Sequence, residues 1–165
     1  MLIQSASASD IDALADLLGI LFLQELEFAP SKELQKRSLE KIISNPQIGH
    51  IICAKLPTQT QALSEPLNSL DQDESLSLIG MVSILFSEST ALGARVAILE
   101  DMIVHPNFRA QGVGSKLLDG AIAFSKQSGC KRITLLTDKT NTNAQSFYRA
   151  HGFTQSSMTT MRVLI

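Results

Sequence analysis

The sequence predicts a mixed α/β domain in which one sheet of about seven strands is flanked by about four helices. Short apolar runs with strand character alternate along the chain with segments whose apolar residues recur at helical spacing. No internal repeat is visible. The 165 residues, 44% of them hydrophobic, suit a single domain, residues 1–165, that buries its own core without disulfide or metal.

The first part of the chain is predicted to form one strand, two helices and a second strand. Residues 2–6 are the first expected strand. The segment SASDIDALADLLGILF follows with apolar residues at helical spacing and with Ser9 as the expected N-cap. A second helix is expected over residues 32–44, and the apolar run HIICAKL, residues 50–56, is expected to be a buried strand.

Residues 57–75 are polar and contain two prolines and an acidic DQDES segment. A strand-like run lies on each side of them. We therefore expect a long mobile loop within a hairpin rather than a linker between domains.

The second part of the chain is predicted to alternate strands and helices. Strands are expected over residues 76–86, 94–104 and 132–137, and helices over residues 113–126 and 143–150. The segments FTQSS and TMRVLI are expected to add two final strands to the sheet.

Composition excludes several classes of function. The net charge of -2 provides no basic excess for general nucleic-acid binding. No apolar run approaches the length of a membrane span and no signal-like N-terminus is present, so a cytoplasmic protein is expected. Cys53 and Cys130 show neither metal-ligand spacing nor a disulfide framework, and no metal is expected. Formation of a homodimer is left open.

The segment RAQGVG, which begins at Arg109, has the features of an anion-binding turn. Gly112 and Gly114 lack the Cβ atoms that would keep a ligand away from the main chain. The first N–H groups of the following helix are unpaired, and Arg109 can add a full positive charge. On spacing alone, an ordinary strand-to-helix turn explains the glycines equally well.

A second motif, NTNAQSFYRAHGF, begins at Asn141. Its Asn141, Ala144 and Phe147 stand three residues apart and share one side of a helix if the turn continues to Tyr148. Taken alone, Phe147 is more typical of the core and Tyr148 of a half-buried anchor.

Together the two motifs resemble the GNAT superfamily of acyl-CoA-dependent N-acyltransferases. RAQGVG is similar to its Arg/Gln-x-x-Gly-x-Gly/Ala signature, and the preceding LEDMIVHPNFR is similar to its fourth strand and the following turn. The second motif resembles its late helix and sixth strand. The resemblance covers residues 76–153 and implies a mostly antiparallel sheet. The fourth strand of such a sheet bulges and splays apart from the fifth, and the pantetheine of CoA enters between them.

The resemblance implies acetyl-CoA as co-substrate and the amine of a small molecule, polyamine-like or other, as acceptor. It also implies three groups of cofactor-binding residues. These are the main chain of Met102, Ile103 and Val104 for pantetheine, then Arg109, Ala110, Gln111, Gly112, Val113, Gly114 and Ser115 for the pyrophosphate, and Asn141 for the thiol-end half.

The resemblance also implies catalytic roles. Glu100 is expected to be the base, acting through water, and Tyr148 the acid that protonates the CoA sulfur. Asp101 is an alternative base or a ligand for a cationic substrate. Glu25 and Glu27 are expected near the acceptor, although solvated surface residues would look the same. A protein or peptide N-acetyltransferase and a non-catalytic CoA-binding module remain alternatives.

Overall fold

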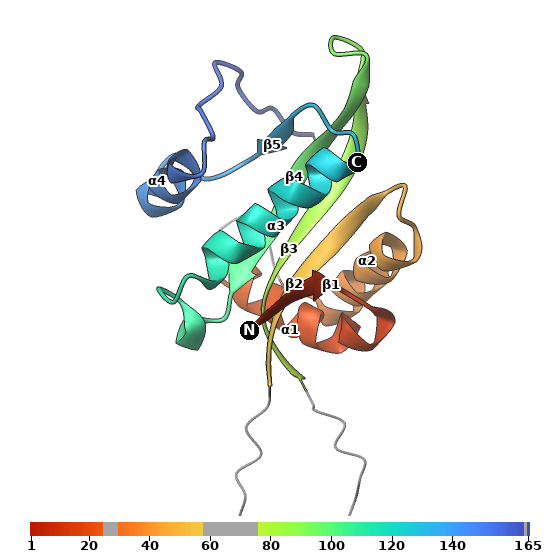
Figure 1. Cartoon of the computed structure of the whole chain (residues 1–165), viewed down its shortest axis with the longest axis vertical. Helices are drawn as coiled ribbons and strands as arrows, with labels where there is room; N and C mark the ends of the chain where they lie inside the picture. The colour runs from red at the N-terminus through yellow and green to blue at the C-terminus, as the bar shows by residue number, and fades with distance from the viewer. Residues whose placement is uncertain (25–29, 58–75, 164) are drawn as a thin grey trace, which may run out of the picture.

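A computed structural model describes residues 1–24, 30–57, 76–163 and 165. Five strands form one sheet in the order β1-β2-β3-β4-β5 (Figure 1). Neighbouring strands are antiparallel except for β4 and β5, which are parallel. The strands are β1 (Leu2–Ser5), β2 (Gly49–Pro57), β3 (Leu76–Ser89), β4 (Ala94–Val104) and β5 (Ile133–Leu135).

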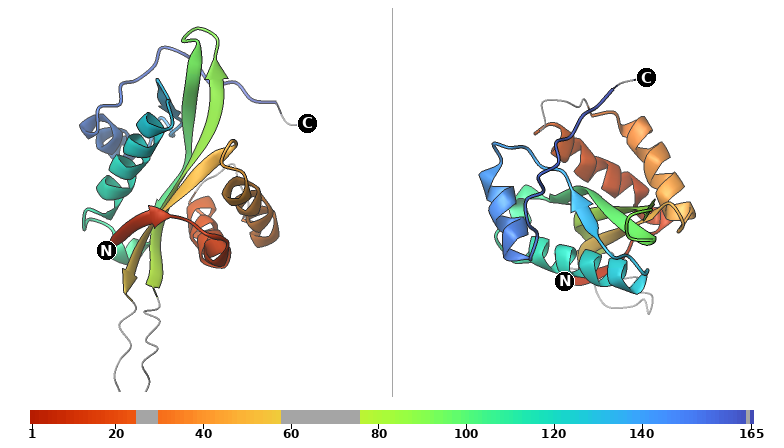
Figure 2. Two further views of the ribbon diagram at one scale, coloured as in Figure 1. Left: turned by 45° about the vertical axis from the view of Figure 1, so that its right-hand side comes forward. Right: turned by 90° about the horizontal axis from the view of Figure 1, so that it is seen from above.

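The described residues also form four α-helices, three of which cover the two faces of this sheet (Figure 2). The helices α1 and α2 lie on one face, and α3 lies on the other. They are α1 (Ile11–Phe22), α2 (Lys32–Ser44), α3 (Val113–Gln127) and α4 (Thr142–Ala150), with short 3-10 turns η1 (Ala8–Asp10) and η2 (Pro106–Phe108). The predicted α/β class with a mixed sheet and four helices is therefore confirmed.

Each face of the sheet has its own buried cluster. On the α3 face, Leu117 and Leu118 pack with Ile52, Val82 and Leu99 of the strands. The α1 and α2 face is filled by a second cluster, which consists of Leu14, Ala15, Leu17, Leu18, Leu39, Ile51, Cys53, Met81 and Ile103. Alternate residues of β2 to β4 supply the two clusters, as the pleat of a strand requires.

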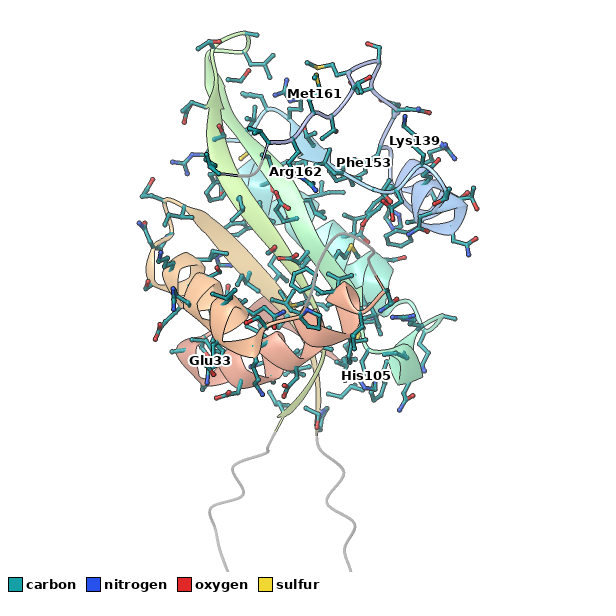
Figure 3. All side chains as sticks on the ribbon, turned by 180° about the vertical axis from the view of Figure 1, so that it is seen from behind. Glu33, His105, Lys139, Phe153, Met161 and Arg162 are labelled. Atoms are coloured by element: carbon teal, nitrogen blue, oxygen red, sulfur yellow. The ribbon has the colours of Figure 1, made fainter. Side chains whose placement is uncertain are left out.

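The prediction of about seven strands was wrong, because FTQSS and TMRVLI form no strand within the described residues 153–163. After α4 the chain passes β5 to the side of the sheet that holds α1 and α2 (Figures 2 and 3). Met161 on this segment is 93% exposed. With only three residues, β5 provides a short edge for a further strand to pair with.

Two smaller expectations also differ from the structure. Ser9 does not cap the first helix. Instead, the Asp10 carboxylate accepts hydrogen bonds from the main-chain N–H and the hydroxyl of Ser7, at 2.8 and 2.9 Å. Pro57, expected to begin the long loop, is the last residue of β2. The rest of that expected loop, residues 58–75, lies outside the described residues.

Candidate active site

The strand β4 contains a β-bulge at its two carboxylates. Val82 of β3 pairs with Met102 and Ile84 pairs with Leu99, so Ser83 alone faces both Glu100 and Asp101. A bulge of this kind places one extra residue in one strand and interrupts the pleat.

The bulge determines on which face of the sheet Glu100 and Asp101 lie. Leu99 belongs to the cluster under α3, and Met102 packs against the same cluster. The two residues between them are therefore displaced toward the face that holds α1 and α2, where Ile103 is also buried. Strict alternation would have separated Glu100 from Asp101.

Ser83 fixes the conformation of the bulge. The Asp101 N–H donates to the Ser83 hydroxyl oxygen at 3.1 Å, and that hydroxyl donates to Asp101 Oδ2 at 3.2 Å. Burial raises the pKa of Asp101 above its ordinary value, the Ser83 hydrogen bond acts against this, and the neighbouring Glu100 charge raises it further. Asp101 is half-buried and Glu100 is exposed.

Beyond the bulge, one edge of β4 is no longer paired with β5. Pairing between these strands ends at Leu99 and Leu135, whereas β4 continues to Val104. The His105 N–H donates to Ile79 O in β3 at 2.8 Å. Because main-chain groups alternate along a strand, those of Ile103 also face β3, and those of Met102 and Val104 face the opposite edge.

The turn before α3 has the geometry of an anion cradle. Gly112 caps the helix with a φ of 77°, and Ala110 has a φ of 59°. The N–H groups of residues 113–115 point out of the first helical turn and have no acceptor within the helix. The side-chain amide of Gln111 donates to Asn107 O at 3.2 Å and holds the turn against η2.

The Arg109 side chain forms hydrogen bonds with residues outside the turn before α3. Its Nε donates to Val104 O at 3.0 Å, and its terminal nitrogen donates to Gln24 Oε1 at 3.4 Å. Arg109 thus connects the turn to the end of β4 and to the residues after α1. Its expected contribution of charge to a bound pyrophosphate stays a prediction.

The helix α4 brings Tyr148 to the unpaired edge of β4. The Asn141 side-chain oxygen caps this helix by accepting the Ala144 N–H at 3.1 Å. The Tyr148 hydroxyl lies 3.8 Å from Met102 Sδ, a distance that suits a weak O–H to sulfur hydrogen bond. Burial raises the pKa of Tyr148, so the hydroxyl keeps its proton near neutral pH.

Gly114 explains how closely these elements approach. A Cβ at this position would lie 3.6 Å from the Phe147 ring and 3.8 Å from the Met102 methyl group. The start of α3, the middle of α4 and the unpaired edge of β4 therefore meet around Met102. The two sequence motifs are brought together here.

Sequence reasoning missed Ser83. It is the single polar residue in the run IGMVSILF, residues 79–86, and that exception was the available signal. The predicted acceptor residues Glu25 and Glu27 lie outside the described residues. Among the residues that the structure does describe, no three His, Cys, Asp or Glu side chains gather as metal ligands. None of the helices in the described ranges is long and apolar enough to cross a membrane.

Comparison with known proteins identifies the family. The sequence model of the Acetyltransferase (GNAT) family matches residues 47–153, which is more than half of the chain and includes both motifs. The chain belongs to the GNAT acetyltransferase family. The predicted resemblance is confirmed, and the bulged β4 and the turn before α3 lie inside the matched region.

Several named relatives share part of the GNAT domain. An uncharacterized N-acetyltransferase, YhfO of Bacillus subtilis (strain 168), is 32% identical over 85 residues, which cover 52% of this chain and 57% of the relative. The thialysine N-epsilon-acetyltransferase of Bos taurus is 30% identical over 90 residues, 54% of this chain and 52% of the relative. These matches therefore span little more than half the length of each relative.

Solved structures with a similar fold superimpose on this chain over almost its whole length. A probable acetyltransferase superimposes with a TM-score of 0.77 and 23% identity, covering 100% of this chain and 98% of its own. A protein described as a transcriptional regulator from Bacillus halodurans C-125 gives a TM-score of 0.75 and 25% identity, covering 99% of each chain.

Proposed function

We propose that this GNAT protein transfers the acetyl group of acetyl-CoA to the primary amine of a small molecule by direct attack. One observation carries the proposal: the Tyr148 hydroxyl lies beside Met102, two residues or fewer along β4 from both carboxylates of the bulge. A proton donor and proton acceptors thus flank the same unpaired strand edge, which acyl transfer to an amine requires.

The residues of the edge and the turn fit a CoA thioester. The Met102 and Val104 main chains can pair with an extended amide-bearing chain as a strand would. The N–H groups of residues 110–115 suit a pyrophosphate, because the helix start carries partial positive charge and Gly114 keeps the approach open. Of the expected main-chain contacts, Ile103 fits less well because its groups face β3. Asn141, which caps α4, remains the proposed contact for the thiol-end half of CoA.

Acetyl-CoA supplies an activated acyl carbon, and the residues of the chain move the protons. The amine nitrogen forms a bond to that carbon, and its proton passes to a carboxylate of the bulge, Glu100 or Asp101. The Met102 N–H is suited to stabilise the oxyanion. Tyr148 donates its proton to the sulfur as the carbon–sulfur bond breaks. Cys53 is unsuited to an acyl-enzyme route because it is buried and burial raises the pKa of its thiol to about 12.

Two features support a small amine as acceptor. The pair of acids on one face of the bulge would attract a cation. Two relatives are named for small molecules, the thialysine N-epsilon-acetyltransferase and the streptothricin acetyltransferase A of Bacillus subtilis (strain 168). The second is 35% identical over 65 residues, which cover 39% of this chain and 38% of the relative. Glu25 and Glu27 remain proposed acceptor contacts.

The test is a thiol-release assay with acetyl-CoA and a panel of polyamines, amino acids, aminoglycosides and short peptides, with the acetylated product identified by mass. We expect CoA release and a product gaining one acetyl group with at least one small amine. Release with peptides alone would move the acceptor to the protein class. Binding of CoA without release for any acceptor would favour a non-catalytic module.

A further inference from the structure

Ser83 is a polar residue in an otherwise apolar strand segment, and it is only 1% exposed. Burying a hydroxyl is unfavourable unless it forms hydrogen bonds. Ser83 forms two, one as acceptor and one as donor, and both go to Asp101. The hydroxyl is therefore committed to one partner.

The two hydrogen bonds act on different parts of Asp101. The bond from the Asp101 N–H holds the extra main-chain residue of the bulge in place. The bond to Oδ2 selects one orientation of the carboxylate. Because Oδ2 already accepts a hydrogen bond from Ser83, Oδ1 is the oxygen that can accept a proton from the amine.

We propose that Ser83 is a positioning residue for acetyl transfer, which holds Asp101 in the bulge of β4 as the carboxylate that takes the proton of the amine. This inference rests on the proposed function and assigns the base within the acidic pair. In the step, the N–H bond of the amine breaks, its electron pair remains on nitrogen, and the proton binds Oδ1. Exposed Glu100 then influences Asp101 by its charge.

The surroundings of Asp101 set the expected pH dependence. Two groups act on the Asp101 carboxylate directly: the charge of Glu100 on β4 and the hydroxyl of Ser83 on β3. The helix α1 presents the apolar side chains of Leu14 and Leu18 to this face of the sheet. A hydrogen bond from Ser83 stabilises the ionised carboxylate, and the Glu100 charge destabilises it. Removing one or the other should therefore move the pKa of Asp101 in opposite directions.

The experiment compares pH profiles of kcat/KM for one amine, so that ionisation of the substrate is common to all variants. Ser83→Ala should move the acidic limb upward by roughly 1 pH unit, and Glu100→Gln should move it downward. Asp101→Asn should lower the rate by roughly 100-fold or more and remove that limb. Ser125→Ala is the matched control, because Ser125 is equally buried at 1% and its hydroxyl has no partner among the described residues.

Each outcome has one meaning. The inference is supported if the acidic limb moves in opposite directions in Ser83→Ala and Glu100→Gln and does not move in the control Ser125→Ala. An unmoved limb in a folded Ser83→Ala variant would reduce Ser83 to a structural residue, and loss of the limb in Glu100→Gln instead of Asp101→Asn would make Glu100 the base. A wild-type protein without transfer activity overturns the proposed function instead.

Folding failure of Ser83→Ala does not end the test. Ser83→Cys keeps the shape but has a weaker donor, and it should move the limb in the same direction. The carboxyl NMR titration of the wild-type protein, compared with that of Asp101→Asn, gives the pKa of Asp101 without a Ser83 variant. A pKa there that differs from the midpoint of the acidic limb of kcat/KM would contradict the assignment.

Discussion

The hydroxyl of Tyr148 on α4 lies 3.8 Å from the sulfur of Met102 on β4. These residues are far apart in sequence and belong to different motifs. Their contact places a proton donor at the edge of β4 just after the bulge. Sulfur is a weak acceptor, so the hydroxyl can turn to a better one.

Tyr148→Phe should therefore separate catalysis from stability. It removes one weak hydrogen bond, and we expect the free energy of unfolding to change by less than about 1 kcal/mol. Turnover should fall roughly 10- to 1000-fold. The loss should shrink with acyl donors whose thiol is more acidic, since such a thiolate needs less protonation. An equal loss for all donors would indicate positioning, and an unchanged rate would leave Tyr148 as an anchor.

Gly114→Val tests the cradle. An added Cβ would make ordinary contacts with Phe147 and Met102. We expect the two further carbons of valine to crowd the start of α3, where the pyrophosphate is proposed to bind. CoA affinity measured by calorimetry should weaken by about 2–4 kcal/mol. Gly19→Val is the control, because a Cβ at Gly19 in α1 has no heavy atom within 4 Å. Equal affinity in both folded variants would refute the phosphate assignment.

The motifs could be predicted from the sequence, because glycine spacing and helical periodicity are local. The family resemblance implied a bulge in the fourth strand, but its position opposite Ser83 could not be read from the sequence, because the register of Ser83 against Glu100 and Asp101 depends on how two strands pair. FTQSS and TMRVLI were predicted to form the two final strands, yet a strand also needs a partner edge. Met161 and Val163 remain exposed instead.

Breaking the buried ion pair of Asp10 and Lys55 should strongly destabilise the fold. Their charged atoms lie 2.5 Å apart, and each residue is 8% exposed. Asp10→Asn leaves the Lys55 charge buried without its partner and should cost about 3 kcal/mol in chemical denaturation. Asp16→Asn, which breaks an exposed pair with Lys32, should cost far less. Similar losses in the two variants would contradict this role.

The pair of Asp10 and Lys55 should also make part of the free energy of unfolding sensitive to acid. Burial alone would raise the pKa of Asp10, but hydrogen bonds from Lys55 and Ser7 lower it below its ordinary value. A depressed pKa stabilises the fold above the unfolded pKa of about 4. That contribution is lost as the pH falls through the folded pKa. The stability difference between wild type and Asp10→Asn should therefore narrow in acid, and a constant difference would argue against it.

Asp101 should make the stability of the fold depend on pH in the opposite direction. Its pKa is raised, mainly by burial, so the folded state holds its proton more tightly than the unfolded chain. Stability then falls as the pH rises from the unfolded pKa through the folded pKa. Asp101→Asn should be more stable than wild type at pH 7 in thermal unfolding, while losing activity. A less stable variant would show that the ionised carboxylate supports the fold.

CoA is proposed to bind along the unpaired edge of β4, and residue-resolved amide hydrogen exchange with and without CoA measures this binding directly. The N–H groups of Met102 and Val104 face that edge, whereas Ile103 between them faces β3. We predict that CoA slows exchange at Met102, Val104 and residues 112–115 and leaves Ile103 almost unchanged. Protection confined to other elements, or equal effects at all three β4 amides, would contradict the account.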